Sequence, residues 1–219
     1  MRDVAPSWVT LFTLRRQQLL DRRAARTEAV TAEADLQERI RLGMLTEIVA
    51  VNRAYPTRTY DGQMTLRFGG REFQLRSEFG DASYSTTLYL PRERIIAVGD
   101  IIVHPMTWTA NGYMISPWID TLHRLDQGEW NMLAPGHGAL QRDREYVRLV
   151  AEFFETVRSQ VRAALRDGIV TEDEVLARLD LSALKARFPA EYGEDFDYYT
   201  ADLGRSFYRE LRDGMVSRP

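Results

Sequence analysis

The sequence predicts an α/β (α+β) fold in which a β-rich core is flanked by helices at both ends of the chain. In the first half of the chain, two short segments alternate apolar and polar residues around a glycine pair, which is typical of a β-hairpin. Apolar residues recur at helical spacing both before and after this region. We therefore divide the chain into a helical N-terminal segment (1–56), a β-rich core (57–165) and a helical C-terminal extension (166–219). At 219 residues, these parts are expected to form one structural domain.

The N-terminal segment is expected to be mostly helical. Residues 8–13 have the apolar content of a short strand, and an amphipathic helix is predicted over 15–26. A longer helix is predicted over about 28–51, because its apolar residues recur every four positions. These residues are Leu36, Ile40, Met44 and Ile48. The helix either packs this stripe on the core or binds a partner.

The core begins with a predicted hairpin of strands at 64–68 and 71–75. Gly69 and Gly70 lie between them, and consecutive glycines supply the positive φ that two-residue hairpin turns require. A third strand is expected at 86–90, followed by a proline-led turn and a short buried strand at 95–98, which runs into Gly-Asp.

The rest of the core is expected to contain a loop, a helix and a strand. Residues 104–117 are rich in aromatics, glycine and proline and predict an irregular loop. A helix is predicted at 118–125 and a strand at 130–134, which leads into Pro135-Gly-His-Gly138. Beyond it, an apolar stripe over 147–165 predicts a long helix.

Two further helices are predicted after Gly168, which ends the long helix. Thr171 and Glu174 have the spacing of a capping box, which marks a helix start. The aromatic, acidic tail leads into a last helix containing Phe207 and Leu211.

Composition excludes several functional classes. The net charge of −3, with basic residues alternating with acidic ones, argues against a nucleic-acid partner. The absence of cysteine excludes disulfides, thiolate metal sites and a cysteine nucleophile. No stretch approaches the roughly 20 apolar residues that span a bilayer, so we expect a cytoplasmic protein without a membrane partner.

Three segments together resemble the C-terminal portion of the metallo-β-lactamase-fold hydrolase superfamily. Residues 90–100 end in Gly-Asp, residues 118–122 read Trp-Ile-Asp-Thr-Leu, and Pro135-Gly-His-Gly138 follows a later strand. Pro135-Gly-His-Gly138 alone is a weak motif. It becomes fairly specific because it follows the other two segments in this order. The resemblance covers about 57–165 and implies a truncated αββα sandwich, because the upstream His-x-His-x-Asp-His motif of such enzymes is missing.

The resemblance also implies a metal site. In the family, the Gly-Asp carboxylate bridges two metal ions and the His of Pro-Gly-His-Gly binds one, which corresponds to Asp100 and His137. Asp81 stands where the family has a further metal-ligating His. Because a catalytic zinc usually needs three protein ligands, these residues are expected to hold one divalent ion, with zinc preferred over manganese or iron.

The expected catalytic set is Asp100 and His137, which the resemblance implies, and His104, which lies at the start of the loop four residues after Asp100. His104 is the candidate for a replacement donor or a general base, and His123 caps or packs a helix. Structural alternatives stay open for each of them: inherited hydrogen bonds for Asp100 and His137, and packing for the other two histidines. Asp81 has the alternative role of a turn former.

The aromatic loop is expected to line the substrate pocket through Met106, Trp108, Tyr113 and Trp118, which would favour a small-molecule substrate with an aryl or apolar group. The implied activity is reduced, promiscuous metal-assisted hydrolysis of an ester, lactone or phosphoester, either phosphotriester or phosphodiester. One alternative is a catalytically inactive scaffold that acts as an oligomeric interaction protein. Another is metal-independent hydrolysis with His137 as the base.

Loss of the first half of such a sandwich would leave one sheet face or edge uncovered. Exposed apolar faces and unpaired edges drive association. A homodimer or larger homo-oligomer is therefore expected, in which a partner chain could rebuild the site at the interface.

Overall fold

The computed structural model describes residues 8–26, 31–50, 57–109 and 115–213. The chain divides into two compact units, residues 1–59 and 60–219. The boundaries predicted after residues 56 and 165, and the expectation that the parts form one structural domain, stay predictions. No helix in the described ranges is long and apolar enough to cross a membrane.

The first unit contains two helices, α1 (Trp8–Ala24) and α2 (Ala32–Ala50). The strand expected at residues 8–13 is wrong, because these residues form the first turns of α1. A helix satisfies its own backbone hydrogen bonds, whereas a lone strand needs a neighbour. Polar contacts join the two helices: the Arg23 guanidinium lies 2.8 Å from the Asp35 carboxylate, and the Arg16 Nε–H donates to Thr46 Oγ1 at 3.0 Å.

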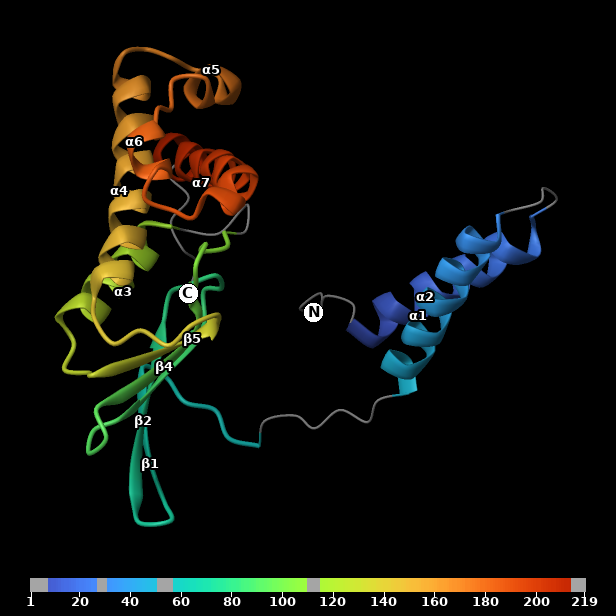
Figure 1. Cartoon of the computed structure of the whole chain (residues 1–219), viewed down its shortest axis with the longest axis horizontal. Coiled ribbons are helices and arrows are strands. Elements are labelled where there is room, and N and C mark those ends of the chain that lie inside the picture. The colour runs from blue at the N-terminus through green and yellow to red at the C-terminus, as the bar shows by residue number, and fades with distance from the viewer. Residues whose placement is uncertain (1–7, 27–30, 51–56, 110–114, 214–219) are drawn as a thin grey trace. The chain divides into compact units, whose positions relative to one another are not determined.

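The second unit is built on a five-stranded sheet with the order β1-β2-β3-β4-β5 (Figure 1). The strands are β1 (Gln63–Phe68), β2 (Arg71–Glu78), β3 (Ser85–Leu90), β4 (Ile95–Val103) and β5 (Met132–His137). The first four pair antiparallel, and the predicted hairpin is confirmed, with φ of 58° at Gly69 and 73° at Gly70. β5 pairs parallel to β4 because α3 (Ser116–Gln127) lies between them in the chain.

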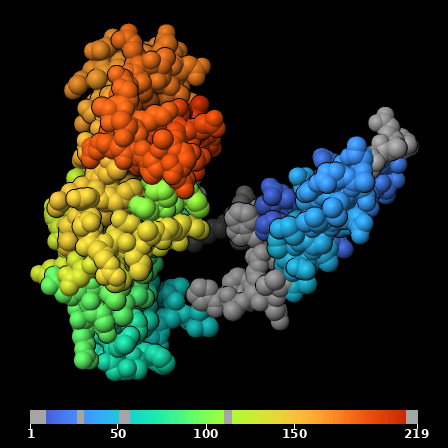
Figure 2. Space-filling view, in the orientation of Figure 1, coloured from blue at the N-terminus to red at the C-terminus, as the bar shows by residue number. Residues whose placement is uncertain are grey.

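Helices form a layer against part of this sheet, and the β1–β2 hairpin extends beyond them (Figure 1). After α3 come α4 (Glu145–Arg166), α5 (Glu172–Leu176), α6 (Ser182–Lys185), η1 (Ala190–Tyr192) and α7 (Gly193–Asp213). The residues of α4 to α7, yellow to red, pack into one continuous layer (Figure 2). Trp118 and Phe154 meet edge to face at the core, with ring centroids 5.0 Å apart. The mixed α/β class is confirmed.

The two faces of the sheet differ in chemistry because side chains alternate along each strand. Ile96, Val98 and Leu133 face the helices and pack in the core. The opposite face carries apolar side chains on all five strands, aligned by the register, such as Leu75 opposite Leu88 and Leu88 opposite Ala97. We call it the open sheet face. Its members are half-exposed: Met64, Leu66, Phe73, Leu75, Leu88, Leu90, Ile95, Ala97, Met132 and Ala134.

Candidate functional site

The candidate site lies where the parallel strands β4 and β5 end side by side. The register of this pair slips between Ala97 and Gly99, and again between Gly99 and Val103, so β4 bulges outward here. Gly99 has φ of 57°, which glycine adopts without strain. A bulge redirects the side chains next to it. As a result, the Asp100 Oδ1 atom stands 3.8 Å from His137 Nε2.

The two glycines of Pro135-Gly-His-Gly138 allow this close approach. A β-carbon on Gly136 would lie 1.7 Å from Asp100 Oδ1, and one on Gly138 would lie 2.0 Å from the His104 carbonyl oxygen. Gly138 also has φ of 87°. Only glycine fits either position, so the motif has a steric role on both sides of His137. The His104 N–H donates to the His137 carbonyl at 3.1 Å and holds the loop to the end of β4.

Aromatic rings flank the two histidines. The Trp108 ring lies 4.6 Å from the His137 ring, centroid to centroid, at a tilt of 41°. The His104 ring meets Tyr146 edge to face at 4.7 Å. Burial lowers the pKa of His104 and raises that of Tyr146, because it disfavours the charged form of each group. The Tyr146 hydroxyl donates to the Val103 carbonyl at 2.8 Å, which ties α4 to the end of β4.

Asp81 and His123 each have a different hydrogen-bond partner outside the Asp100–His137 pair. Asp81 is in the bend before β3, where it accepts a hydrogen bond from the Ser85 hydroxyl at 3.2 Å. This contact favours the turn-forming alternative. His123 pairs with Glu155 at 2.9 Å between α3 and α4, which favours its structural alternative.

The residues predicted to line the substrate pocket also differ in their surroundings. Met106 and Trp118 are 2% and 0% exposed in the core, and the Trp118 indole N–H donates to the Ile101 carbonyl. Trp108 is partly exposed beside His137. Tyr113 lies outside the described residues. The pocket assignment stays a prediction, and Trp108 is the member that the structure brings to the site.

A metal ion could find two donors of the right kind here, an imidazole nitrogen and a carboxylate oxygen. Both are accessible, with the Asp100 side chain 39% and the His137 side chain 56% exposed. Among the described residues, however, no group of three His, Cys, Asp or Glu side chains could hold an ion. Asp81 therefore does not complete a three-ligand set with the pair. Within the described ranges, one chain therefore brings together two of the three ligands that a catalytic ion usually needs.

No family model matches the chain, and no curated protein matches its sequence. Solved structures do resemble it. A stereoselective inverting sec-alkylsulfatase from Pseudomonas sp. matches with a TM-score of 0.53, 14% identity, and coverage of 74% of this chain and 28% of that one. A β-lactamase domain protein from Burkholderia ambifaria matches with a TM-score of 0.52, 13% identity, and coverage of 80% and 52%.

A metallo-β-lactamase family protein from Thermus thermophilus is also similar, with 18% identity, coverage of 95% and 62%, and a TM-score of 0.49. At these identities the similarity concerns the fold. The expected resemblance to the metallo-β-lactamase fold is confirmed at that level. The chain spans less than two thirds of the length of each of these three structures.

Proposed function

We propose that this chain carries part of a metal-assisted hydrolase site, centred on Asp100 and His137, that cleaves ester-type bonds. The observation that supports it most is the 3.8 Å approach of the two side chains, made possible by Gly136 and a bulged strand. Candidate substrates are carboxylic esters, lactones and phosphoesters. The similarity of fold to an alkylsulfatase adds sulfate esters to the classes worth testing.

The residues around the pair suggest how a substrate would be held. Trp108 lies beside the His137 ring and offers an exposed aromatic surface for an aryl or alkyl group. The lowered pKa of His104 keeps its imidazole neutral near pH 7, so it can accept a proton. We assign substrate positioning to Trp108 and the role of base to His104.

A divalent ion, zinc before manganese or iron, would supply Lewis-acid activation of water or of the ester. Asp100 and His137 would hold it, and a further donor would have to come from outside the described residues of one chain. We propose that a second copy supplies this donor by packing against the open sheet face.

The dimensions of this face are compatible with such a pairing. Five strands at about 4.8 Å spacing and about 20 Å length give a flat area of about 480 Å² per copy. Two copies would then bury about 1,000 Å², the lower limit for a specific interface. Apolar faces of two sheets pack in this way in β-sandwiches.

The test combines turnover with substitutions. Aryl esters, lactones, phosphotriesters, phosphodiesters and sulfate esters are assayed with and without added zinc, manganese or iron. Asp100→Asn and His137→Gln are expected to abolish turnover, and chelation is expected to suppress it in the wild type. Glu155→Gln, which removes the carboxylate paired with His123, is the matched control and should retain activity.

The main competing function is a catalytically inactive interaction scaffold, and the two-donor site favours it. Under that alternative, no substrate class turns over, and Asp100→Asn and His137→Gln change stability alone. Turnover that survives chelation but fails in His137→Gln would instead indicate metal-free hydrolysis with His137 as the base. Either outcome contradicts the proposed metal-assisted activity.

A further inference from the structure

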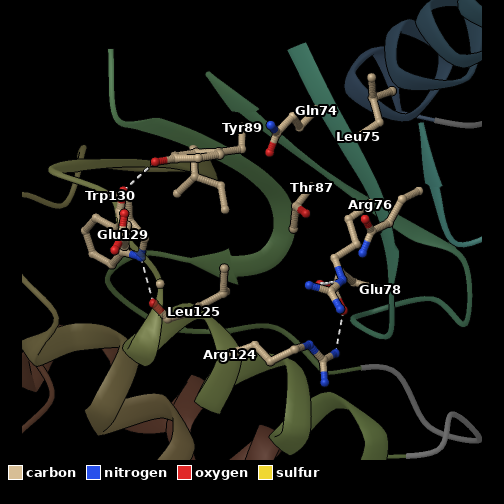
Figure 3. Close-up of a pocket in the computed structure, with 13 residues that line it drawn as sticks. Gln74, Leu75, Arg76, Glu78, Thr87, Tyr89, Arg124, Leu125, Glu129 and Trp130 are labelled. Atoms are coloured by element: carbon tan, nitrogen blue, oxygen red, sulfur yellow. Dashed lines mark hydrogen bonds and ion pairs between the residues drawn. The ribbon is translucent and has the colours of Figure 1, made fainter. Parts of the chain in front are cut away.

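A second ligand site is suggested by a cavity of about 190 Å³ on the helix-facing side of the sheet (Figure 3). It lies between strands β1 to β4 and the C-terminal end of α3. None of Asp81, Asp100, His104 and His137 lines it. The cavity is therefore distinct from the candidate hydrolase site, and a ligand bound in it would not depend on the proposed hydrolase activity.

One end of the cavity is cationic. Glu78 is only 6% exposed, and its carboxylate pairs with two guanidinium groups, Arg76 at 3.3 Å and Arg124. Among the residues that line this end of the cavity, two cations thus share one anion. Both arginine side chains are about half exposed and each has five N–H donors, so they retain donors for a ligand.

The opposite wall is apolar and aromatic. The Tyr89 hydroxyl donates to the Glu129 carbonyl at 2.5 Å, and the Trp130 indole N–H donates to the Leu125 carbonyl at 2.7 Å. The polar atoms of both rings are therefore already paired, and the rings, with Ile96, present apolar surface. Figure 3 shows Tyr89, Trp130 and Glu129 at one end of the cavity, and Arg76, Arg124 and Glu78 at the other.

Thr87 supplies a polar group between these two ends (Figure 3). It lines the cavity, and the residue is 4% exposed. A hydroxyl can both donate and accept a hydrogen bond, so Thr87 offers a polar contact to a ligand in the cavity.

We propose that this cavity binds a small organic monoanion consisting of one apolar or aromatic ring and a carboxylate. The carboxylate would contact Arg76 and Arg124, the ring would pack on Tyr89 and Trp130, and Thr87 would donate to the ligand. The volume of the cavity suits a ligand with one ring, because an engineered apolar cavity of about 150 Å³ holds one benzene ring.

Benzoate is the probe, and benzamide is its uncharged analogue of the same shape. Ligand-observed NMR saturation transfer and protein tryptophan fluorescence would report binding to the full chain. Benzoate is expected to bind about tenfold more tightly than benzamide, as charge-assisted hydrogen bonds allow. Arg76→Gln, which keeps the Arg124–Glu78 pair and so protects the fold, should weaken benzoate binding several-fold and leave benzamide unchanged.

Thr87→Val preserves shape and removes the hydroxyl, and it should weaken the binding of both probes. Arg142→Gln is the matched control, because Arg142 is exposed and does not line the cavity. Equal affinity for the two probes, no benzoate binding at millimolar concentration, or equal losses in Arg76→Gln and Arg142→Gln would each overturn the proposal. Circular dichroism of each variant establishes that a loss of binding is not a loss of fold.

Discussion

Gly136 approaches Asp100 so closely that a β-carbon at residue 136 would stand 1.7 Å from the Asp100 carboxylate oxygen. The same β-carbon would lie 2.5 Å from the Gly99 carbonyl carbon. Both the Asp100 side chain and the Gly99 backbone would therefore have to move to make room for it. The spacing between Asp100 and His137 therefore depends on a residue that has no side chain.

Gly136→Ala is expected to push β5 away from β4 and separate Asp100 from His137. The cost should be about 1–3 kcal/mol in the free energy of unfolding, as for other overpacked sites. Urea denaturation followed by circular dichroism measures it. Gly193→Ala is the matched control, since a β-carbon there would meet only the end of the Lys185 side chain at 3.5 Å. Identical midpoints for the two variants would argue against the steric role.

Leu88→Glu tests the open sheet face as the surface that joins two copies. Leu88 lies near the centre of this face, opposite Leu75 on one side and Ala97 on the other. A charge buried at such an interface is costly, so we expect a dimeric wild type and a monomeric variant. Sizing with light scattering at micromolar concentration measures this. Thr65→Glu, on the other face of the edge strand β1, should stay dimeric. A monomeric wild type would contradict the proposed pairing.

Asp202 on α7 gives the protein a stability that depends on pH. Burial raises the pKa of its carboxyl group above the ordinary 3.8, although the Thr109 hydroxyl, Arg205 and Arg209 act in the opposite direction. The folded state then binds the proton more tightly than the unfolded state, so stability falls as pH rises from about 3.8 through the raised pKa. Asp202→Asn should lose this dependence. Thermal unfolding of both proteins, measured between acidic and neutral pH, should show that the variant gains stability relative to the wild type as the pH rises. Parallel plots of stability against pH would contradict the assignment.

Thr171 caps the short helix α5 by accepting a hydrogen bond from the Glu174 N–H at 3.4 Å. Thr171→Ala removes this acceptor and should cost about 1 kcal/mol of stability. Thr171→Ser keeps the hydroxyl and serves as the control. Chemical denaturation of the three proteins measures the difference, and an alanine variant as stable as the serine variant would show that the cap contributes nothing.

The sequence was sufficient where local chemistry decides the structure. Gly69 and Gly70 specify their turn because few other residues adopt positive φ, and Thr171 with Glu174 specifies a helix start. The proximity of Asp100 and His137 was also predictable, because both belong to strands that the family resemblance places side by side.

Sequence patterns were insufficient to predict the structure where contacts between residues far apart in the chain determine it. Trp118 belongs to a loop-to-helix segment rich in aromatics, yet it is buried in the core, because helix α4 packs against it from a position far along the chain. The pairing of Glu78 with Arg124 joins residues 46 positions apart, and no local pattern indicates it. Residues 8–13 have the composition of a strand, but they form a helix, and no strand lies beside them among the described residues to pair with.

The most direct test of the proposed site is the metal content of the purified, untagged protein, measured by elemental mass spectrometry beside His137→Gln. We predict at least about one zinc, manganese or iron ion per pair of chains in the wild type, since two copies together provide enough donors for a complete site. We also predict that His137→Gln loses this metal while remaining folded. A metal content below about a tenth of this amount in the wild-type protein, measured after reconstitution, would contradict the metal-assisted site. Such a content is well short of the occupancy that a three-ligand site needs.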